Sequence, residues 1–348
     1  MTISEKTEII KTNEQTLPFP ADSVFYHNMN HDLWPKELRL YVTEKCNFKC
    51  SFPCGTLWCH ETSDLSNNRL DGSLKDFLTV ADSFHSSLGF TKVKIAGMEP
   101  TLWKPLRTLV QGLQDIGYCD ISLTTNGYHL RKYLPGLIRC GLNRLTVSLH
   151  SLQQQIFKQI SCTGQLNKVT DSLSLAKDFS LPTKINHVLI RGVNTNIRPF
   201  LNYCHKNCFE PKLYQLIWHP KISRVYNNYF IEVEKVIQSL KLEFSRVEVF
   251  NFPLSQRTRY KYYTKDVAPL IFGKFQKKGD SNLPICQKCH FRYQCQEGFM
   301  GYGYNVLPNL DFSPCYLRDE LSFNLRKKIA NKELDDLPEI ITSIAGID

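Results

Sequence analysis

The chain has 348 residues, 42% of them hydrophobic, which is enough for one barrel-sized domain with a smaller appendage. No apolar run approaches the roughly 18 to 20 residues of a membrane span, which argues against a membrane protein. The net charge of +10 suits an anionic substrate, a phosphorylated ligand or nucleic acid, although the charges are scattered and also suit a solvated surface.

The first predicted segment, residues 1–35, lacks strong periodicity and is expected to form an extended or partly ordered N-terminal arm. Its opening residues are polar and carry acids, so we expect no signal peptide. A cytoplasmic protein without a membrane association is the resulting prediction.

From residue 38, strand-like runs alternate with helix-like segments. Strands are expected at LRLYVTEK, KVKIAG, ISLTTNG, RLTVSLHS, TKINHVLI and LYQLIWHP. Helices are expected at SLKDFLTVADSFHSSLG, PLRTLVQGLQDIG, LRKYLPGLIRCG, VTDSLSLAKDFS and IRPFLNYCHKN. Six strands, each followed by helical sequence, predict an α/β fold that forms a partial (β/α)6 TIM-like barrel. In such folds the chemistry lies at the carboxyl ends of the strands.

The alternating pattern weakens after about residue 220. Residues 228–262 indicate a helix and a strand, and residues 263–320 are rich in Lys, Gly, Pro and Cys. We therefore predict a core over residues 36–225 and a small Cys-rich C-terminal domain over residues 226–348.

Thirteen cysteines are an unusual number for this length. Eight fall into two groups, and in a reducing compartment such groups are more often metal sites than disulfides. The remaining five are interpreted as core or surface residues: Cys119, Cys140, Cys162, Cys204 and Cys208.

The first group, Cys46, Cys50, Cys54 and Cys59, begins where the first predicted strand ends. A ligand-binding loop belongs at that end of a strand. The group lacks the paired C-x2-C knuckles of most zinc sites, and thiolates also suit iron–sulfur clusters. A zinc or disulfide loop is the alternative.

This stretch resembles the radical S-adenosylmethionine (SAM) superfamily, whose signature is C-x3-C-x2-C with an aromatic residue before the third cysteine. Cys46 and Cys50 match the first half. The third ligand is Cys54, at a spacing of three, or Cys59, at a spacing of eight. We favour Cys59, because Trp58 precedes it and the family's aromatic residue packs beside the SAM adenine. The resemblance implies a SAM-binding [4Fe-4S] cluster with one open iron, and cleavage of SAM to a 5′-deoxyadenosyl radical.

Three later motifs follow the order of the family. KIAGMEPTLW resembles the G-G-E-P motif that holds the SAM amino group, with Gly97 and Glu99 at matching positions. VSLHS resembles V-S-L-D-S, in which the matching Ser148 contacts SAM, and His150 replaces the usual aspartate. Each motif alone also fits an ordinary strand-to-turn segment.

The motif LTTNG ends the third strand. Its hydroxyl and amide groups are candidates for hydrogen bonds to SAM, from Thr125 and Asn126, or to substrate, from Thr124. Thr and Asn are also common turn residues, which is the alternative interpretation.

The resemblance covers about residues 38–219 and is closest to the GTP cyclase group of molybdenum-cofactor biosynthesis. Arg39 and Lys184 match two of that group's substrate-contacting cations, and strand-end surface cations are the alternative. The chain ends in AGID rather than the group's Gly-Gly, and Arg292 is the only arginine in CQKCHFRYQC. We therefore expect a substrate other than GTP.

The second group comprises Cys286, Cys289, Cys295 and Cys315. The resemblance implies a second, auxiliary [4Fe-4S] cluster here, as in enzymes with "twitch"- or SPASM-type domains. Four thiolates would close the cluster, and three would leave an iron for substrate. A four-cysteine zinc knuckle is the alternative, because C-x2-C suits zinc equally well.

The predicted function is that of a radical SAM enzyme that abstracts hydrogen from a small, anionic molecule in cofactor, nucleoside or natural-product biosynthesis. A reducing partner such as flavodoxin or ferredoxin is expected. One alternative is a maturase that modifies a ribosomal peptide. The other is a zinc-bearing nucleic-acid-binding protein, for which only RTRYKYYTKD offers basic residues interleaved with aromatics.

Overall fold

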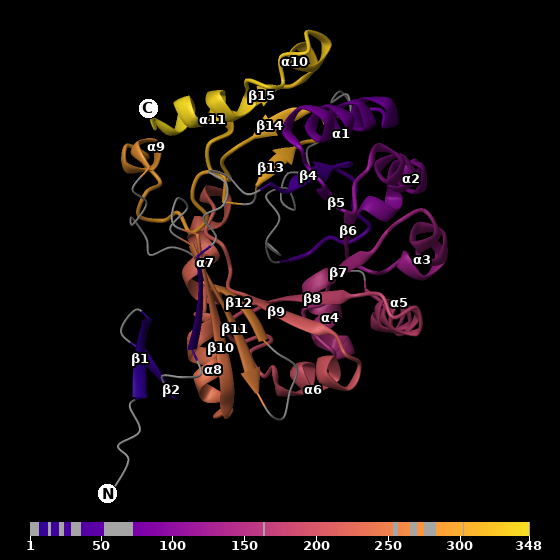
Figure 1. The fold of residues 1–348 in the computed structure, drawn as a ribbon. Helices are drawn as coiled ribbons and strands as arrows, with labels where there is room; N and C mark the ends of the chain where they lie inside the picture. The colour runs from indigo at the N-terminus through magenta and orange to yellow at the C-terminus, as the bar shows by residue number, and fades with distance from the viewer. Residues whose placement is uncertain are drawn as a thin grey trace, which may run out of the picture.

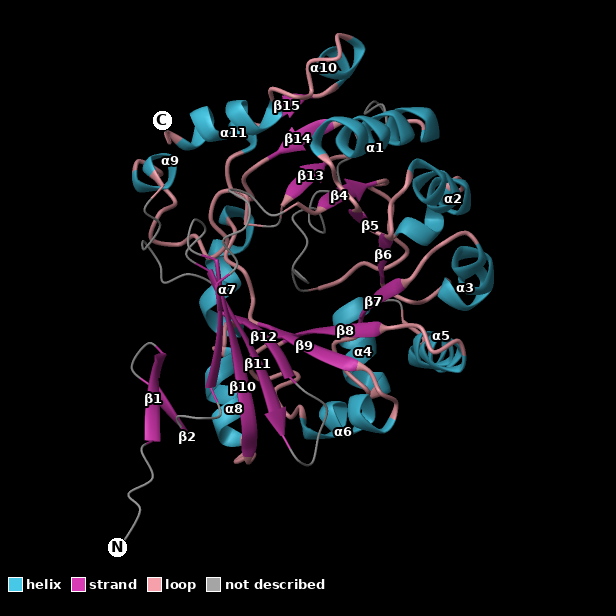
Figure 2. Ribbon diagram, viewed as in Figure 1, coloured by secondary structure: helices cyan, strands magenta, loops and turns pink. Residues whose placement is uncertain are grey.

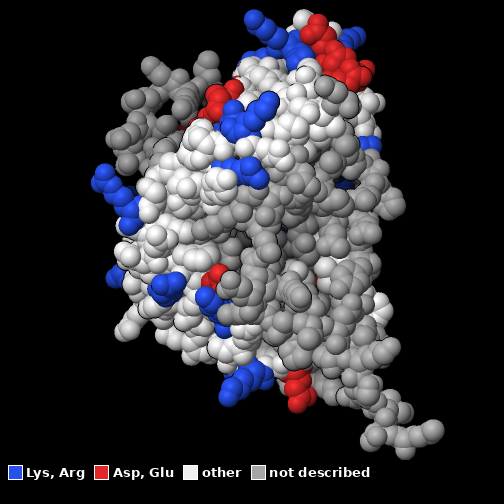
Figure 3. Space-filling view, turned by 90° about the vertical axis from the view of Figure 1, so that its left-hand side faces the viewer, with Lys and Arg blue, Asp and Glu red and all other residues white. Residues whose placement is uncertain are grey.

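The structure is a computed structural model, and it describes residues 7–12, 15–20, 24–28, 36–51, 72–162, 164–252, 257–264, 270–274, 283–301 and 303–347. Within these residues, no helix has the length and apolar character needed to cross a membrane. On the face that Figure 3 presents, Lys and Arg side chains are spread out rather than gathered into one patch.

Six neighbouring parallel strands form the centre of the sheet, in the same order as in the chain. They are β4 (Leu38–Tyr41), β5 (Lys92–Ala96), β6 (Asp120–Thr125), β7 (Arg144–Ser148), β8 (Thr183–Val188) and β9 (Glu210–Tyr214). In the described part of the chain, the two outermost strands of the sheet, at its opposite edges, do not pair with each other, so the barrel is open. The predicted α/β partial barrel is confirmed.

Helical crossovers connect these strands and lie in a row along the outside of the sheet, on the right in Figures 1 and 2. They are α1 (Leu74–Leu88), the 3-10 helix η2 (Pro100–Leu102) with α2 (Leu106–Ile116), α3 (Leu130–Arg139), α4 (Gln154–Ser161) with α5 (Leu166–Asp178), and α6 (Arg198–Lys206). The sequence gives α1 clear ends: Ser73 forms a capping box with Asp76, and Gly89 adopts the left-handed conformation after the last turn.

Strand alternation separates a hydrophobic outer face from a polar inner face. On β4, Leu38 and Leu40 are fully buried in the core, whereas Arg39 and Tyr41 are half-buried and line a cavity. Because successive side chains of a strand point to opposite faces, the helices cover one face and the cavity occupies the other. The core therefore lies between the sheet and its helices.

Further strands extend the sheet at both edges, to a total of thirteen strands in the described part of the chain. Beside β4 lie β13 (Tyr304–Val306), β14 (Asp311–Ser313) and β15 (Phe323–Asn324). Beside β9 lie β12 (Leu270–Lys274), β11 (Arg257–Thr264), β10 (Phe244–Phe252) and β3 (Val24–Asn28). Residues that follow the barrel, together with β3 from before it, thus extend the sheet on both sides of the barrel strands.

The remaining elements lie outside this sheet. Two strands, β1 (Thr7–Thr12) and β2 (Gln15–Pro20), pair with each other as an antiparallel hairpin. The others are η3 (Pro220–Ile222), α7 (Ser223–Tyr229), α8 (Val233–Ser239), α9 (Pro284–Gln287), η4 (Asp319–Leu321), α10 (Arg326–Ala330) and α11 (Leu337–Ala345).

Two details differ from the sequence predictions. The last barrel strand was expected at LYQLIWHP but ends at Tyr214, because Leu216 packs with Tyr226 of α7, and Ile217 packs with Tyr316, in place of extending the ladder. The predicted arm contains three strands, and β3 pairs in parallel with β10, a contact between distant segments that local periodicity does not reveal.

Candidate functional site

The loop after β4 carries the first two cysteines of the SAM-cluster signature and is attached to α4. The backbone N–H groups of Lys49 and Ser51 donate to Ser161 O and Ile160 O at 3.1 and 2.9 Å. The predicted third ligand Cys59, its alternative Cys54 and the aromatic Trp58 lie outside the described residues. The end of α4 thus fixes the position of the first half of the signature.

The Cys46 sulfur faces polar groups of two strand ends. It accepts a hydrogen bond from the backbone N–H of Phe48 at 3.3 Å and one from Asn126 Nδ2 at 3.9 Å. Asn126 also donates to Asn47 Oδ1 at 2.8 Å, so one amide connects β6 to the cysteine loop. Donors of this kind stabilise a thiolate, the form that binds iron.

Glu99 is the centre of the hydrogen-bond network at this end of the sheet, and it is 0% exposed. One carboxylate oxygen accepts from the Thr101 hydroxyl at 2.5 Å and from the Thr125 hydroxyl at 2.7 Å. The other accepts from the backbone N–H of Asn126 at 2.7 Å. Glu99 therefore fixes the backbone from which Asn126 reaches Cys46.

Gly97 and Ser148, both predicted to contact SAM, line the cavity on the inner face of the sheet. Gly97 has φ +136°, and a Cβ there would lie 2.8 Å from the carbonyl oxygen of Thr43. Only glycine fits this close approach of β5 to β4. The Thr125 side chain, in contrast, is directed away from the cavity toward Glu99.

Two buried histidines occupy the next strand ends. His150 Nδ1 accepts the backbone N–H of Val188 at 3.2 Å, and His187 Nδ1 lies 2.9 Å from Leu149 O. Burial, with a smaller effect of His187, lowers the pKa of His150 to about 3, and burial lowers the pKa of His187 to about 4. Both rings are neutral near pH 7 and brace β7 against β8.

A cavity of about 400 Å³ lies on the inner face, between the barrel strands and the Cys-rich segment. It brings the three predicted substrate residues, Arg39, Thr124 and Lys184, together with Gly97 and Ser148. A volume of this size suits a small polar ligand.

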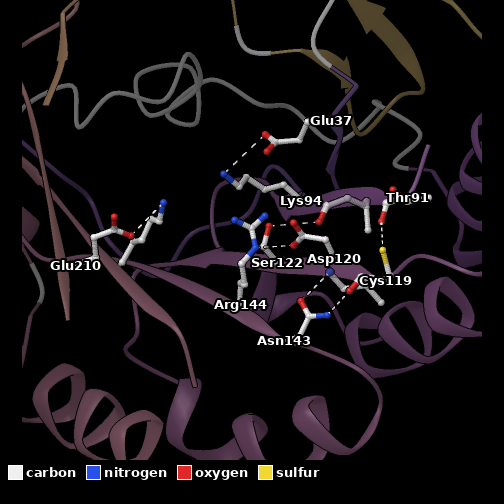
Figure 4. A network of polar contacts seen from close by, with 12 residues as sticks. Glu37, Thr91, Lys94, Cys119, Asp120, Ser122, Asn143, Arg144 and Glu210 are labelled. Atoms are coloured by element: carbon white, nitrogen blue, oxygen red, sulfur yellow. Dashed lines mark hydrogen bonds and ion pairs between the residues drawn. The ribbon is translucent and has the colours of Figure 1, made fainter. Parts of the chain in front are cut away.

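The inner wall also carries charges that motif matching missed. They belong to Glu37, Lys94, Arg144, Glu210 and Lys212. Figure 4 shows several of them facing one another across neighbouring strands. Period-two alternation in segments such as KVKIA and RLTVS, with polar residues at every second position, is the sequence signal for an inner wall of this kind.

The second cysteine group surrounds a separate small cavity of about 30 Å³. Cys286, Cys289, Cys295 and Cys315 all line it, and Cys315 lines the larger cavity as well. Backbone N–H groups donate to the sulfurs of Cys289 and Cys295 at 3.4 Å. Burial raises the pKa of Cys315 to about 12.

Among the described residues, no three His, Cys, Asp or Glu side chains are grouped so as to hold a single metal ion.

Comparison with known proteins identifies the family. Residues 40–204 match the radical SAM superfamily. A probable GTP 3′,8-cyclase of Saccharolobus islandicus is 30% identical over 213 residues, which are 60% of this chain and 66% of that protein. One of Archaeoglobus fulgidus is 29% identical over 290 residues, 81% of this chain and 86% of that protein. Streptococcus suis SuiB bound to S-adenosylmethionine is similar at 16% identity and a TM-score of 0.48, over 81% of this chain and 58% of that one.

The chain therefore carries a radical SAM domain over residues 40–204. Within that superfamily its curated relatives are probable GTP 3′,8-cyclases, which agrees with the predicted cyclase-like group. The family implies a [4Fe-4S] cluster and SAM. The chain covers just under two thirds of the Saccharolobus relative, at 66% of its length.

Proposed function

We propose that this enzyme reductively cleaves SAM and abstracts a hydrogen atom from a small anionic substrate held in the large cavity. The observation that supports this most is the composition of that cavity. Its lining joins Gly97 and Ser148, on the SAM side, to the cations Arg39 and Lys184 and to Cys315 of the second cysteine group.

In this proposal Cys46, Cys50 and Cys59 hold the SAM-binding cluster, and the hydrogen bonds to the Cys46 sulfur fit a ligating thiolate. When bound, the cluster and SAM together supply the 5′-deoxyadenosyl radical. The chain's own residues position the groups that hold the cluster. Asn126 orients the Cys46 sulfur, and Glu99 fixes Asn126.

The proposed SAM contacts come from Trp58, Gly97, Glu99, Thr125, Asn126 and Ser148. Glu99 and Thr125 are bonded to each other, so we assign them a positioning role beside any direct contact. Gly97 and Ser148 face the cavity directly.

The C-terminal region, residues 226–348, is proposed to carry an auxiliary iron–sulfur cluster on Cys286, Cys289, Cys295 and Cys315, and the barrel region, residues 36–225, to cleave SAM. Four thiolates around one cavity, two of them accepting backbone N–H groups, fit such a cluster. We propose that flavodoxin or ferredoxin supplies the electrons.

Substrate binding is assigned to Arg39, Thr124 and Lys184. All three line the large cavity, from the alternate strands β4, β6 and β8. A cation and a hydroxyl together hold an anion by charge and by hydrogen bonds.

Anaerobic purification followed by iron, sulfide and zinc analysis tests the proposal, together with an assay of SAM cleavage after reduction. Two clusters predict about eight irons per chain and formation of 5′-deoxyadenosine. Zinc in place of iron, with no cleavage of SAM, would contradict the proposal.

A further inference from the structure

The cations that face the large cavity are already paired with carboxylates. Glu37 Oε1 lies 2.6 Å from Arg39 Nη2 and 3.9 Å from Lys94 Nζ. One carboxylate therefore neutralises part of the charge of two cations on adjacent strands, β4 and β5. The side chains of all three are no more than 26% exposed, so the solvent screens these pairs only in part.

The same arrangement recurs on the other barrel strands. Arg144 Nε donates to Asp120 Oδ1 at 2.5 Å, and Lys184 Nζ lies 3.1 Å from Glu210 Oε2. Glu210 also lies 3.6 Å from Lys261, which reaches it from β11. Three carboxylates thus accompany the cations along these strands (Figure 4). A wall suited to a polyanionic ligand would be expected to carry cations alone.

The charge balance of this wall limits the charge of its ligand. Among the residues that the structure describes, five cations line the cavity: Arg39, Lys94, Arg144, Lys184 and Lys212. Glu37 and Glu210 also line the cavity, and together with Asp120 behind Arg144 they pair with Arg39, Lys94, Arg144 and Lys184. A phosphate monoester carries about −1.5 to −2 at pH 7, whereas a triphosphate carries roughly twice as much and would meet the carboxylates.

Strand register places the charges relative to the SAM side. Arg39, Lys94, Ser122 and Arg144 are register partners across β4 to β7. Ser148 lies four residues beyond Arg144 on β7, which is about 13 Å along the strand. A ligand anchored at this row and extending to the strand ends is about as long as a nucleotide.

We propose that the substrate is a molecule of nucleotide length with a single phosphate monoester, anchored at the row of Arg39, Lys94 and Arg144. In this account Glu37, Asp120 and Glu210 are specificity-determining residues that disfavour a triphosphate. The inference rests on the proposed function, because it assigns the large cavity to the substrate.

Equilibrium binding to the anaerobic, cluster-loaded protein tests the inference with GMP and GTP, a pair that differs only in phosphate number. Isothermal titration is expected to give a dissociation constant at least about tenfold lower for GMP, with inorganic phosphate competing. Tighter binding of GTP, or no saturable binding of GMP and phosphate, would overturn the inference.

Variants of the carboxylates test which of them disfavours the triphosphate. Glu210→Gln and Asp120→Asn should each shift the GMP-to-GTP preference toward GTP by about tenfold, because each removes one repulsive charge. Glu232→Gln, at an exposed pair with Lys235, is the matched control and should leave the ratio unchanged. Thermal melts establish that each variant is folded, and an unchanged ratio in both folded cavity variants would also overturn the inference.

SAM cleavage without added ligand is measured on the same samples. Cleavage with no preference for GMP refutes the substrate class alone, whereas absence of cleavage refutes the proposed function.

Discussion

Glu99 connects the strand ends on the SAM side of the site through hydrogen bonds. Its replacement by Gln should therefore destabilise the fold. The amide nitrogen of Glu99→Gln would face donors from Thr101, Thr125 or Asn126, which leaves a buried group unsatisfied. We expect a loss of about 2–3 kcal/mol in the free energy of unfolding and a lower rate of SAM cleavage. Chemical denaturation and the 5′-deoxyadenosine assay measure the two effects. A variant as stable and active as the wild type would show that this network is dispensable.

The histidine pair at the ends of β7 and β8 predicts a pH dependence of stability. The folded-state pKa values of about 3 for His150 and about 4 for His187 lie below the ordinary value of 6.5. Between these values the unfolded chain binds more protons, so stability is full above pH 6.5 and falls as the pH decreases toward 4. At pH 5 each ring is expected to lower the free energy of unfolding by about 2 kcal/mol relative to pH 7.5, as measured by urea denaturation.

The His187→Asn variant should lose part of this pH dependence. The control is His205→Gln on α6, where the histidine is exposed, and it should keep the wild-type profile. A wild-type profile that is flat between pH 7.5 and 5 would contradict the assignment of two neutral buried rings.

At the scale of elements, the close approach of β4 and β5 depends on one glycine. Gly97→Ala places a Cβ 2.8 Å from the Thr43 carbonyl at φ +136°, so it should cost about 1–3 kcal/mol and lower SAM binding. Gly136→Ala inside α3 is the control, because its Cβ would lie 3.6 Å from Arg107 Cδ and helix propensity favours alanine. Equal thermal stability of the two variants would refute the steric argument.

The same elements show what sequence alone predicts. The first five barrel strands follow from hydrophobic runs and from helices with clear ends, such as α1 between Ser73 and Gly89, whereas β9 overlaps its predicted run only at its end. The order of Cys46, Glu99, Asn126 and Ser148 on successive strand ends predicts the family. These signals lie within short segments, so they can be recognised in a single sequence.

The charged inner wall depends on register between strands that are far apart in the chain. Glu37 faces Lys94, and Lys184 faces Glu210, because parallel strands align in one particular way. No periodicity within one segment reveals such pairs. The parallel pairing of β13 with β4 is a contact of the same long-range kind.

At the scale of the whole molecule, the two cysteine groups are proposed to hold separate clusters, so their losses should be independent. Of the described cysteines in the two groups, Cys315 lines the large cavity. Cys46→Ala and Cys315→Ala should each lower the iron content by about four per chain in anaerobically reconstituted protein. Cys119→Ala, at an exposed cysteine outside both groups, should keep the full content. Retention of all iron by Cys315→Ala would contradict the auxiliary cluster.

The proposed chemistry is tested most directly by the yield of 5′-deoxyadenosine when the anaerobically reconstituted, reduced enzyme is incubated with SAM. We expect 5′-deoxyadenosine and methionine in equal amounts from the wild type and from Cys119→Ala, and none above background from Cys46→Ala. A wild-type enzyme that carries its iron and yet forms no 5′-deoxyadenosine, or a Cys46→Ala variant that forms as much as the wild type, would contradict it.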